Sequence, residues 1–118
     1  MLGYFRMSRR RDEDRQDFEP DDILSGFEWH PAKAVSNLKK HKVSFEEAST
    51  VFKDTQRIEV PDQWHSDDEQ RYLGIGRSIQ GRILSIYYTF RARKIRIISA
   101  RLAERWERNE YETGNEQF

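Results

Sequence analysis

Three strand-like segments that follow one another closely constrain this chain more than any other feature. They span residues 71–77, 82–89 and 94–99, and each connection between them is only four residues long. Because connections this short join antiparallel neighbours, the sequence predicts an antiparallel meander. In the first segment Gly74 and Gly76 leave one side without side chains, so a helix or a ligand can approach the backbone there.

A helix is predicted before the meander, from Pro31 to about Lys40. Proline suits the first helical turn because its missing N–H group is not needed there. The stripe expected to face the core consists of Ala34, Val35 and Leu38, and the outward face consists of Lys33, Asn37 and Lys40. His41 and Lys42 are expected to end this helix.

A second helix is predicted from Ser44 to about Lys53. Ser44 and Glu47 have the spacing of a capping box, in which the serine hydroxyl accepts from the Glu47 amide and the Glu47 carboxylate returns the bond. The buried face of this helix would consist of Phe45, Ala48, Val51 and Phe52. The two helices would run antiparallel with a tight connection between them.

The remaining ordered segments are shorter. Strands are predicted at residues 27–29 and 57–60. A last helix is predicted over about 100–112, capped by Ser99 and anchored by Ala103 and Trp106. Two N-terminal helices, an antiparallel sheet and a C-terminal helix together predict an α+β fold.

Charge and hydropathy separate one folded domain from its ends. Residues 1–26 carry mixed charge and few apolar anchors, which predicts a flexible N-terminal tail. The domain would span residues 27–113, and residues 114–118 would form a frayed C-terminus. The sequence has no cysteine, hence no disulfide or thiolate zinc site, and no apolar run of membrane-spanning length. We therefore expect a soluble cytoplasmic protein that does not contact the membrane.

The formal net charge of zero hides a strong asymmetry along the chain. Between Arg71 and Trp106 there are nine cations and one acid, a balance of +8, and both flanks of this block are acidic. Such a positive centre predicts a polyanion-binding surface, because the arginine guanidinium matches phosphate oxygens. The alternative is that these charges only solvate the outer face of a sheet.

Several familiar site signatures do not occur in the sequence. His30, His41 and His65 lie on three different predicted elements, with no pair at metal-ligand spacing. His65, Ser66 and Asp67 are adjacent residues and cannot adopt the geometry of a catalytic triad. The glycine pair of the first strand lacks the third glycine and the following helix of a dinucleotide site. No metal or cofactor is therefore expected.

The remaining basic and aromatic residues indicate RNA. Cleavage by a 2′-hydroxyl needs a base, an acid and a cation that stabilises charge on the phosphate, and arginine can supply the cation without a metal. Candidate phosphate ligands are Arg77, Arg82, Arg96 and Arg101, and candidate stacking residues are Trp29, Trp64, Tyr87 and Tyr88. His41 follows the basic pair Lys39-Lys40 and could transfer protons, although the helix dipole also favours a histidine at a helix C-terminus. For Trp29 the alternative is core packing.

Two blocks of the sequence resemble the BrnT family of toxins. The first runs from Phe27 to Ala48, and the second includes Ile75-Gly76-Arg77 and Arg96 to Arg101, followed by Glu107-Arg108 and Tyr111-Glu112. The resemblance implies a RelE-like fold and the toxin of a type II toxin–antitoxin system, a metal-independent endoribonuclease that inhibits translation. It also implies a BrnA-type antitoxin with a ribbon-helix-helix domain as the partner, and operator DNA bound only through the complex.

The chain departs from the family pattern at four positions. Lys42 stands where glycine is usual, and a left-handed Lys42 would cost about 1 kcal/mol relative to glycine. His30 stands where an acid is usual. Leu102 and Trp106 occupy positions that are often basic, so the last helix is less cationic here.

The sequence therefore predicts a toxin ribonuclease. Arg96 and Arg101 would bind the scissile phosphate. Arg77 would assist from the neighbouring strand, and His41 would carry a proton. Further RNA contacts would come from Lys39, Lys40, Arg82, Arg91, Arg93, Tyr88 and Trp29. Arg101→Ala is expected to relieve growth arrest and leave the fold intact. The alternative is a non-catalytic module that binds RNA or an acidic protein through the same basic face.

Overall fold

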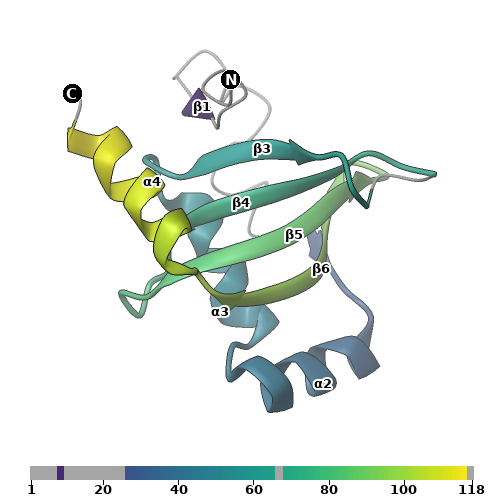
Figure 1. The fold of residues 1–118 in the computed structure, drawn as a ribbon. Helices are drawn as coiled ribbons and strands as arrows, with labels where there is room; N and C mark the ends of the chain where they lie inside the picture. The colour runs from purple at the N-terminus through teal and green to yellow at the C-terminus, as the bar shows by residue number, and fades with distance from the viewer. Residues whose placement is uncertain (1–7, 10–25, 66–67, 117–118) are drawn as a thin grey trace.

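The computed structural model describes residues 8–9, 26–65 and 68–116 of the chain. Within these residues the fold is α+β, as the sequence predicts. The strands are β1 (Ser8–Arg9), β2 (Phe27–Glu28), β3 (Ile58–Asp62), β4 (Arg71–Arg77), β5 (Ile83–Arg91) and β6 (Lys94–Leu102) (Figure 1). The helices are α2 (Pro31–His41), α3 (Phe45–Ser49), the 3₁₀ helix η3 (Thr50–Lys53) and α4 (Arg105–Glu116). The predicted N-terminal tail lies outside the described residues except for β1 and Gly26, and residues 117–118 also lie outside them.

The described strands form one six-stranded sheet in the order β1-β3-β4-β5-β6-β2. Strands β3 to β6 are consecutive in the chain, and each pairs antiparallel with the next. At the two edges β1 pairs antiparallel with β3, and β2 pairs parallel with β6. The loop between β5 and β6 is shorter than predicted: only Ala92 and Arg93 lie between the strands, with φ values of 51° and 69°. Positive φ at both central residues is the geometry of a type I′ hairpin turn.

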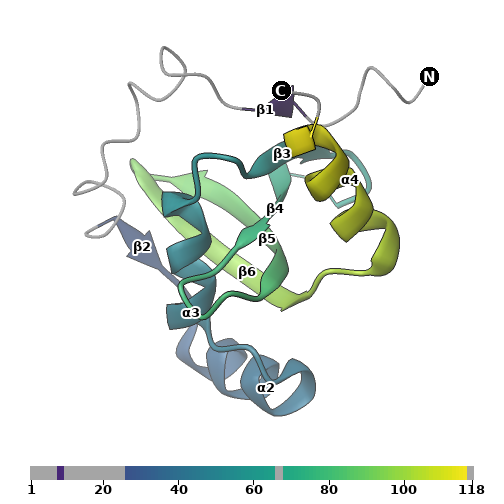
Figure 2. The ribbon, with the colours of Figure 1, turned by 90° about the vertical axis from the view of Figure 1, so that its left-hand side faces the viewer.

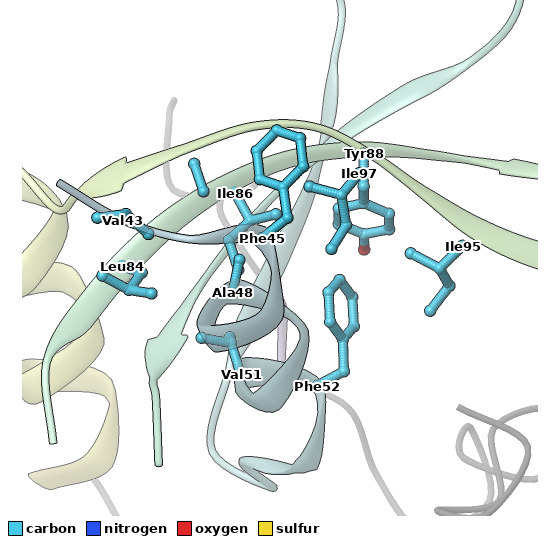
Figure 3. Close-up of a cluster of buried hydrophobic side chains, with 11 residues drawn as sticks. Val43, Phe45, Ala48, Val51, Phe52, Leu84, Ile86, Tyr88, Ile95 and Ile97 are labelled. Atoms are coloured by element: carbon cyan, nitrogen blue, oxygen red, sulfur yellow. The ribbon is translucent and has the colours of Figure 1, made fainter. Parts of the chain in front are cut away.

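The larger core lies between the sheet and the α3–η3 segment. Figure 3 shows Phe45, Ala48, Val51 and Phe52 of this segment beside Leu84, Ile86, Tyr88 and Ile97 of the sheet. The predicted buried face of the second helix is therefore confirmed. Tyr88 is 1% exposed and its ring packs edge-on against Phe52, with centroids 4.9 Å apart, so it cannot stack on an RNA base. Trp29 packs against Phe45 at 5.7 Å, which is the core role considered as the alternative.

The bare side of β4 is occupied by the protein itself. A Cβ atom on Gly76 would lie 2.8 Å from Val51 Cγ1 and 2.9 Å from Arg57 Cβ, closer than real Cβ contacts. Of the two possibilities that the sequence left open, a helix and a ligand, the structure shows η3 at Gly76.

Helix α2 packs against the core through Ala34, as predicted, but the other residues of its inner face differ from the prediction. Val35 and Leu38 are 68% and 48% exposed, whereas Asn37 is 6% exposed. The Asn37 amide donates to the Val43 and Ala100 carbonyls at 3.0 and 2.8 Å, and its oxygen accepts from the Ala100 N–H at 3.2 Å. Beyond the short β2, the edge of β6 needs polar partners for its backbone, and Asn37 supplies them. An apolar side chain could not do so, which explains why Asn37 is buried although the sequence predicted it to face outward.

The last helix begins five residues later than predicted, because β6 continues through Ser99 and Ala100 to Leu102. Ser99 pairs with Tyr87 in the sheet and does not cap a helix. Helix α4 starts at Arg105, and the Glu107 carboxylate accepts from the Glu104 N–H at 2.7 Å, as the third residue of a capping box does. Buried Ala103 and Tyr111 contribute to a second, smaller core between α4 and the sheet, but Trp106 is 53% exposed and is not an anchor.

Two predictions about the α2–α3 connection can be compared with its geometry. Lys42 ends α2 as predicted, and it adopts the left-handed conformation with φ 60°, in which its N–H bonds the Leu38 carbonyl. Ser44 Oγ accepts from the Glu47 N–H at 2.9 Å, which confirms the first half of the capping box. The Glu47 carboxylate instead accepts from Arg82 and from the Ser78 hydroxyl, because these donors face it across the domain.

Candidate functional site

Helices cover the two faces of the sheet unequally. Figure 2 shows α3 and α4 on opposite sides of the sheet, and in Figure 1 α4 lies over one end of its side only. The strand pairings and the alternation of side chains identify which residues face the uncovered part. We call this surface the open face. It consists of Arg71 in β4, Tyr87 and Arg91 in β5, and Lys94, Arg96, Ser99 and Arg101 in β6; Thr89 points to the same side but is buried.

A bulge in β6 places Arg101 on the open face. Tyr88 pairs with Ile97 and the next residue, Tyr87, pairs with Ser99, so Ile98 is an extra residue. In a regular strand Arg96 and Arg101 would point to opposite faces, because their positions differ by an odd number and successive side chains alternate between faces. The extra residue reverses the alternation and brings both arginines to one side.

Two cations of the open face, Arg91 and Arg96, are paired with carboxylates from distant segments. Arg96 donates to Glu28 in β2 at 3.2 Å, and the two side chains are 26% and 30% exposed. Arg91 donates to Glu69 at 3.0 Å, with side chains 50% and 31% exposed. Pairs with this exposure contribute roughly 0–1 kcal/mol each, so a phosphate can displace the carboxylate at little cost.

Arg101 is held much more firmly. Its guanidinium donates to both oxygens of Glu107 at 2.8 and 3.0 Å, and Glu107 is 1% exposed. The second N–H group of Nη1 donates to the Leu102 carbonyl at 3.3 Å, and the second N–H group of Nη2 donates to the Tyr87 hydroxyl at 3.4 Å. Four of the five N–H groups are therefore committed within the protein. Arg101 joins α4 to the sheet and positions Tyr87, and a phosphate would find few of its donors unoccupied.

The pKa values of this pair follow from its geometry. Burial opposes ionisation of Glu107, but Arg101, the Glu104 N–H and the Ser85 hydroxyl together hold its pKa below the ordinary value of 4.5. The hydrogen bonds to Glu107 outweigh burial and raise the pKa of Arg101 above its usual range. Both groups stay charged at neutral pH.

His65 is a further candidate site residue, which the sequence did not indicate. It lies just beyond β3, and its Nδ1 is 2.8 Å from the Asp62 carboxylate. Its ring packs edge-on against Tyr87 with centroids 6.1 Å apart, and the Arg101 guanidinium lies 5.8 Å from the same Tyr87 ring. The sequence reasoning considered Asp67 as a partner of His65 and rejected it. The available signal was an aspartate three residues before the histidine, at the end of a predicted strand.

The other predicted site residues lie apart from this group. Arg77 donates to the Gly81 carbonyl at 3.1 Å. Its guanidinium also lies over the ring of Tyr111, a residue of α4. Arg82 binds Glu47 and the Lys42 carbonyl, so it holds the α2–α3 connection against the β4–β5 hairpin. Lys39 and Lys40 are exposed at the end of α2, His41 is half-buried there, and Arg93 is exposed in the β5–β6 turn.

Among the described residues, no group of three or more histidine or acidic side chains could hold a metal ion. Over the same residues, the helices are all too short or too polar to cross a membrane.

Comparisons with known proteins agree with the resemblance seen in the sequence. Residues 29–107 match the family model described as the ribonuclease toxin, BrnT, of type II toxin–antitoxin systems. The crystal structure of the Brucella abortus ribonuclease toxin BrnT is similar to this fold, with a TM-score of 0.52 and 19% sequence identity. The match covers 65% of this chain and 94% of that one. No curated protein sequence matches the chain.

Proposed function

Because the chain belongs to the BrnT family of ribonuclease toxins of type II toxin–antitoxin systems, we propose that it cleaves RNA on the open face without a metal ion. The observation that carries this proposal is the open face itself. It presents arginines whose carboxylate partners are displaceable, on a surface that no described helix covers.

The contacts on the open face suggest different roles for its arginines. Arg96 and Arg91 would bind the phosphates on either side of the cleaved bond, because their carboxylate partners are partly exposed. Arg101 is a positioning residue, since Glu107 occupies its strongest donors and Tyr87 is held by one of the rest. In this proposal the 2′-hydroxyl attacks the neighbouring phosphate, and cations stabilise the charge that develops on its oxygens. Lys39, Lys40 and Arg93 would contact more distant parts of the RNA.

The family assignment also supports a partner. We propose that a BrnA-type antitoxin with a ribbon-helix-helix domain neutralises this toxin, and that operator DNA is bound only through the complex. We further propose that the fold is RelE-like and that the toxin inhibits translation in the cytoplasm.

A cleavage assay with purified full-length protein and RNA tests the proposal. Cleavage should persist in EDTA and leave a 2′,3′-cyclic phosphate, the product of 2′-hydroxyl attack. Arg96→Ala should slow cleavage without unfolding the protein, whereas Lys33→Ala, a change of an exposed lysine on α2, should leave the rate unchanged. Cleavage that requires added Mg²⁺ would contradict the metal-independent mechanism. Tight, salt-sensitive binding of RNA that remains intact would instead support the non-catalytic alternative.

A further inference from the structure

The carboxylates beside the open face, Glu28 and Glu69, are paired with Arg96 and Arg91, so another group is needed to accept a proton from the 2′-hydroxyl. The sequence pointed to His41 for this task, but His41 is half-buried at the end of α2. His65 is placed differently: its ring contacts Tyr87, a residue of the open face that also accepts from Arg101.

Asp62 fixes the chemical state of the His65 ring. The Asp62 side chain is 6% exposed, and its oxygens interact separately with the Trp64 N–H at 3.2 Å and His65 Nδ1 at 2.8 Å. An ionised carboxylate can only accept, so Nδ1 must carry the proton of this bond. The neutral ring then has its lone pair on Nε2, and the His65 side chain is 64% exposed, so Nε2 is open to a substrate.

We propose that His65 is the general base of RNA cleavage and that Asp62 is its positioning residue, an inference that rests on the proposed function. His65 Nε2 accepts the proton of the 2′-hydroxyl as the 2′-oxygen forms a bond to phosphorus. The bond from phosphorus to the 5′-oxygen breaks, and the leaving oxygen takes a proton from water. The products are a 2′,3′-cyclic phosphate and a 5′-hydroxyl, and the His65 imidazolium returns its proton to the hydroxide formed. Asp62 holds the ring and stabilises the imidazolium during this step.

The charges around His65 are consistent with this role. Asp62 faces Nδ1 from β3, and Tyr87 faces the ring from β5. Arg71 of β4 lies opposite Asp62 in the strand pairing, and Arg101 of β6 reaches Tyr87. The Asp62 carboxylate therefore supports the imidazolium, while Arg101 is neutralised by Glu107 and acts on His65 only through Tyr87. An imidazole base predicts a cleavage rate that falls as the pH drops below neutrality.

The test uses the purified full chain, an RNA oligonucleotide in EDTA, and the same oligonucleotide with 2′-O-methyl groups as a binding probe that cannot be cleaved. His65→Gln should reduce kcat at least about a hundredfold, with KM and probe affinity within about threefold of wild type. Asp62→Asn should reduce kcat at least about tenfold with the same unchanged KM. The control is His30→Asn, because His30 is exposed and its Nδ1 accepts from the Ala32 N–H, an N-cap role that asparagine can keep. This control should match wild type.

The pH dependence and three further outcomes complete the test. The loss of rate on acidification should be present in wild type and in His30→Asn, and absent from the residual activity of His65→Gln. If wild type cleaves RNA and His65→Gln cleaves it within threefold of the same rate, this inference is wrong while the proposed function stands. If His65→Gln loses affinity for the probe in proportion to its rate, His65 binds RNA and is not the base. If wild type does not cleave RNA at all, the proposed function itself is wrong.

Discussion

Replacing Arg101 by alanine should destabilise the fold, contrary to what the sequence suggested. The substitution removes both charge-assisted hydrogen bonds to Glu107, a carboxylate that is 1% exposed. Removing one partner of a buried ion pair typically costs 3–5 kcal/mol, and the Ser85 hydroxyl and Glu104 N–H still solvate the carboxylate, so we expect about 3 kcal/mol. At about 4 °C per kcal/mol for a domain of this size, the Tm should fall by about 12 °C.

Thermal and urea unfolding followed by circular dichroism would measure this loss. The matched control is Arg96→Ala, which breaks a partly exposed pair and should cost about 1 kcal/mol or less. The folded-state pKa of Glu107 is depressed, so its stabilisation is present above pH 4.5 and is lost as the pH falls through that lower pKa. The difference in free energy of unfolding between wild type and Arg101→Ala should therefore become smaller as the pH falls. The reasoning would be refuted if the two variants lost equal free energy of unfolding, or if the free energy of unfolding of Arg101→Ala lay within 1 kcal/mol of the wild-type value. Lost toxicity in Arg101→Ala is thus no proof of a catalytic role.

Two other predictions concern the backbone and a buried phenol. Lys42→Gly should raise stability by about 1 kcal/mol, because Lys42 has φ 60° and glycine adopts this conformation without steric cost; a lower Tm would contradict it. Burial, followed by the hydrogen bond to Asp54, raises the pKa of Tyr111 from 10.0 to about 12. Its stabilisation should be complete below pH 10.0 and fall as the pH rises toward about 12, and a phenolate absorbance titration compared with Tyr111→Phe would check this.

The sequence predicted those parts of the fold in which local pattern and burial agree. The three-strand segment, the apolar face of α3 and the left-handed Lys42 all follow from spacing or from one residue's conformational preference. The face of α2 did not follow, because what decides it is the backbone of β6, a segment distant in sequence whose edge requires Asn37. The spacing of hydrophobic residues cannot predict that the β6 backbone needs hydrogen-bond partners from α2.

The candidate site depends on two features that a linear pattern does not encode. The bulge at Ile98 decides which face Arg101 occupies, and strict alternation would have separated it from Arg96. The partner of His65 is Asp62 across a chain reversal after β3, whereas the sequence offered the adjacent but geometrically useless Asp67. Residue types indicated RNA, but the tertiary structure decided which of them share a surface.

In the folded protein, acids from distant segments neutralise several cations of the basic stretch between Arg71 and Trp106, and Glu28 is one of these acids. Distant acids fold back onto the cations, and on the open face Glu28 neutralises Arg96 at 3.2 Å. Glu28→Gln should leave the strand pairing of β2 intact while freeing Arg96 for a phosphate, so RNA affinity should rise. Since Arg96 already binds a phosphate in the wild-type complex, the salt dependence of affinity should change little in Glu28→Gln, whereas Arg96→Ala should reduce the slope of log affinity against log salt by about 0.7 for single-stranded RNA. Fluorescence anisotropy with the 2′-O-methyl probe over a salt series would measure both quantities. Glu46→Gln, an exposed change on α3, is the control and should alter neither. An unchanged salt slope in Arg96→Ala would mean that Arg96 does not contact the RNA backbone.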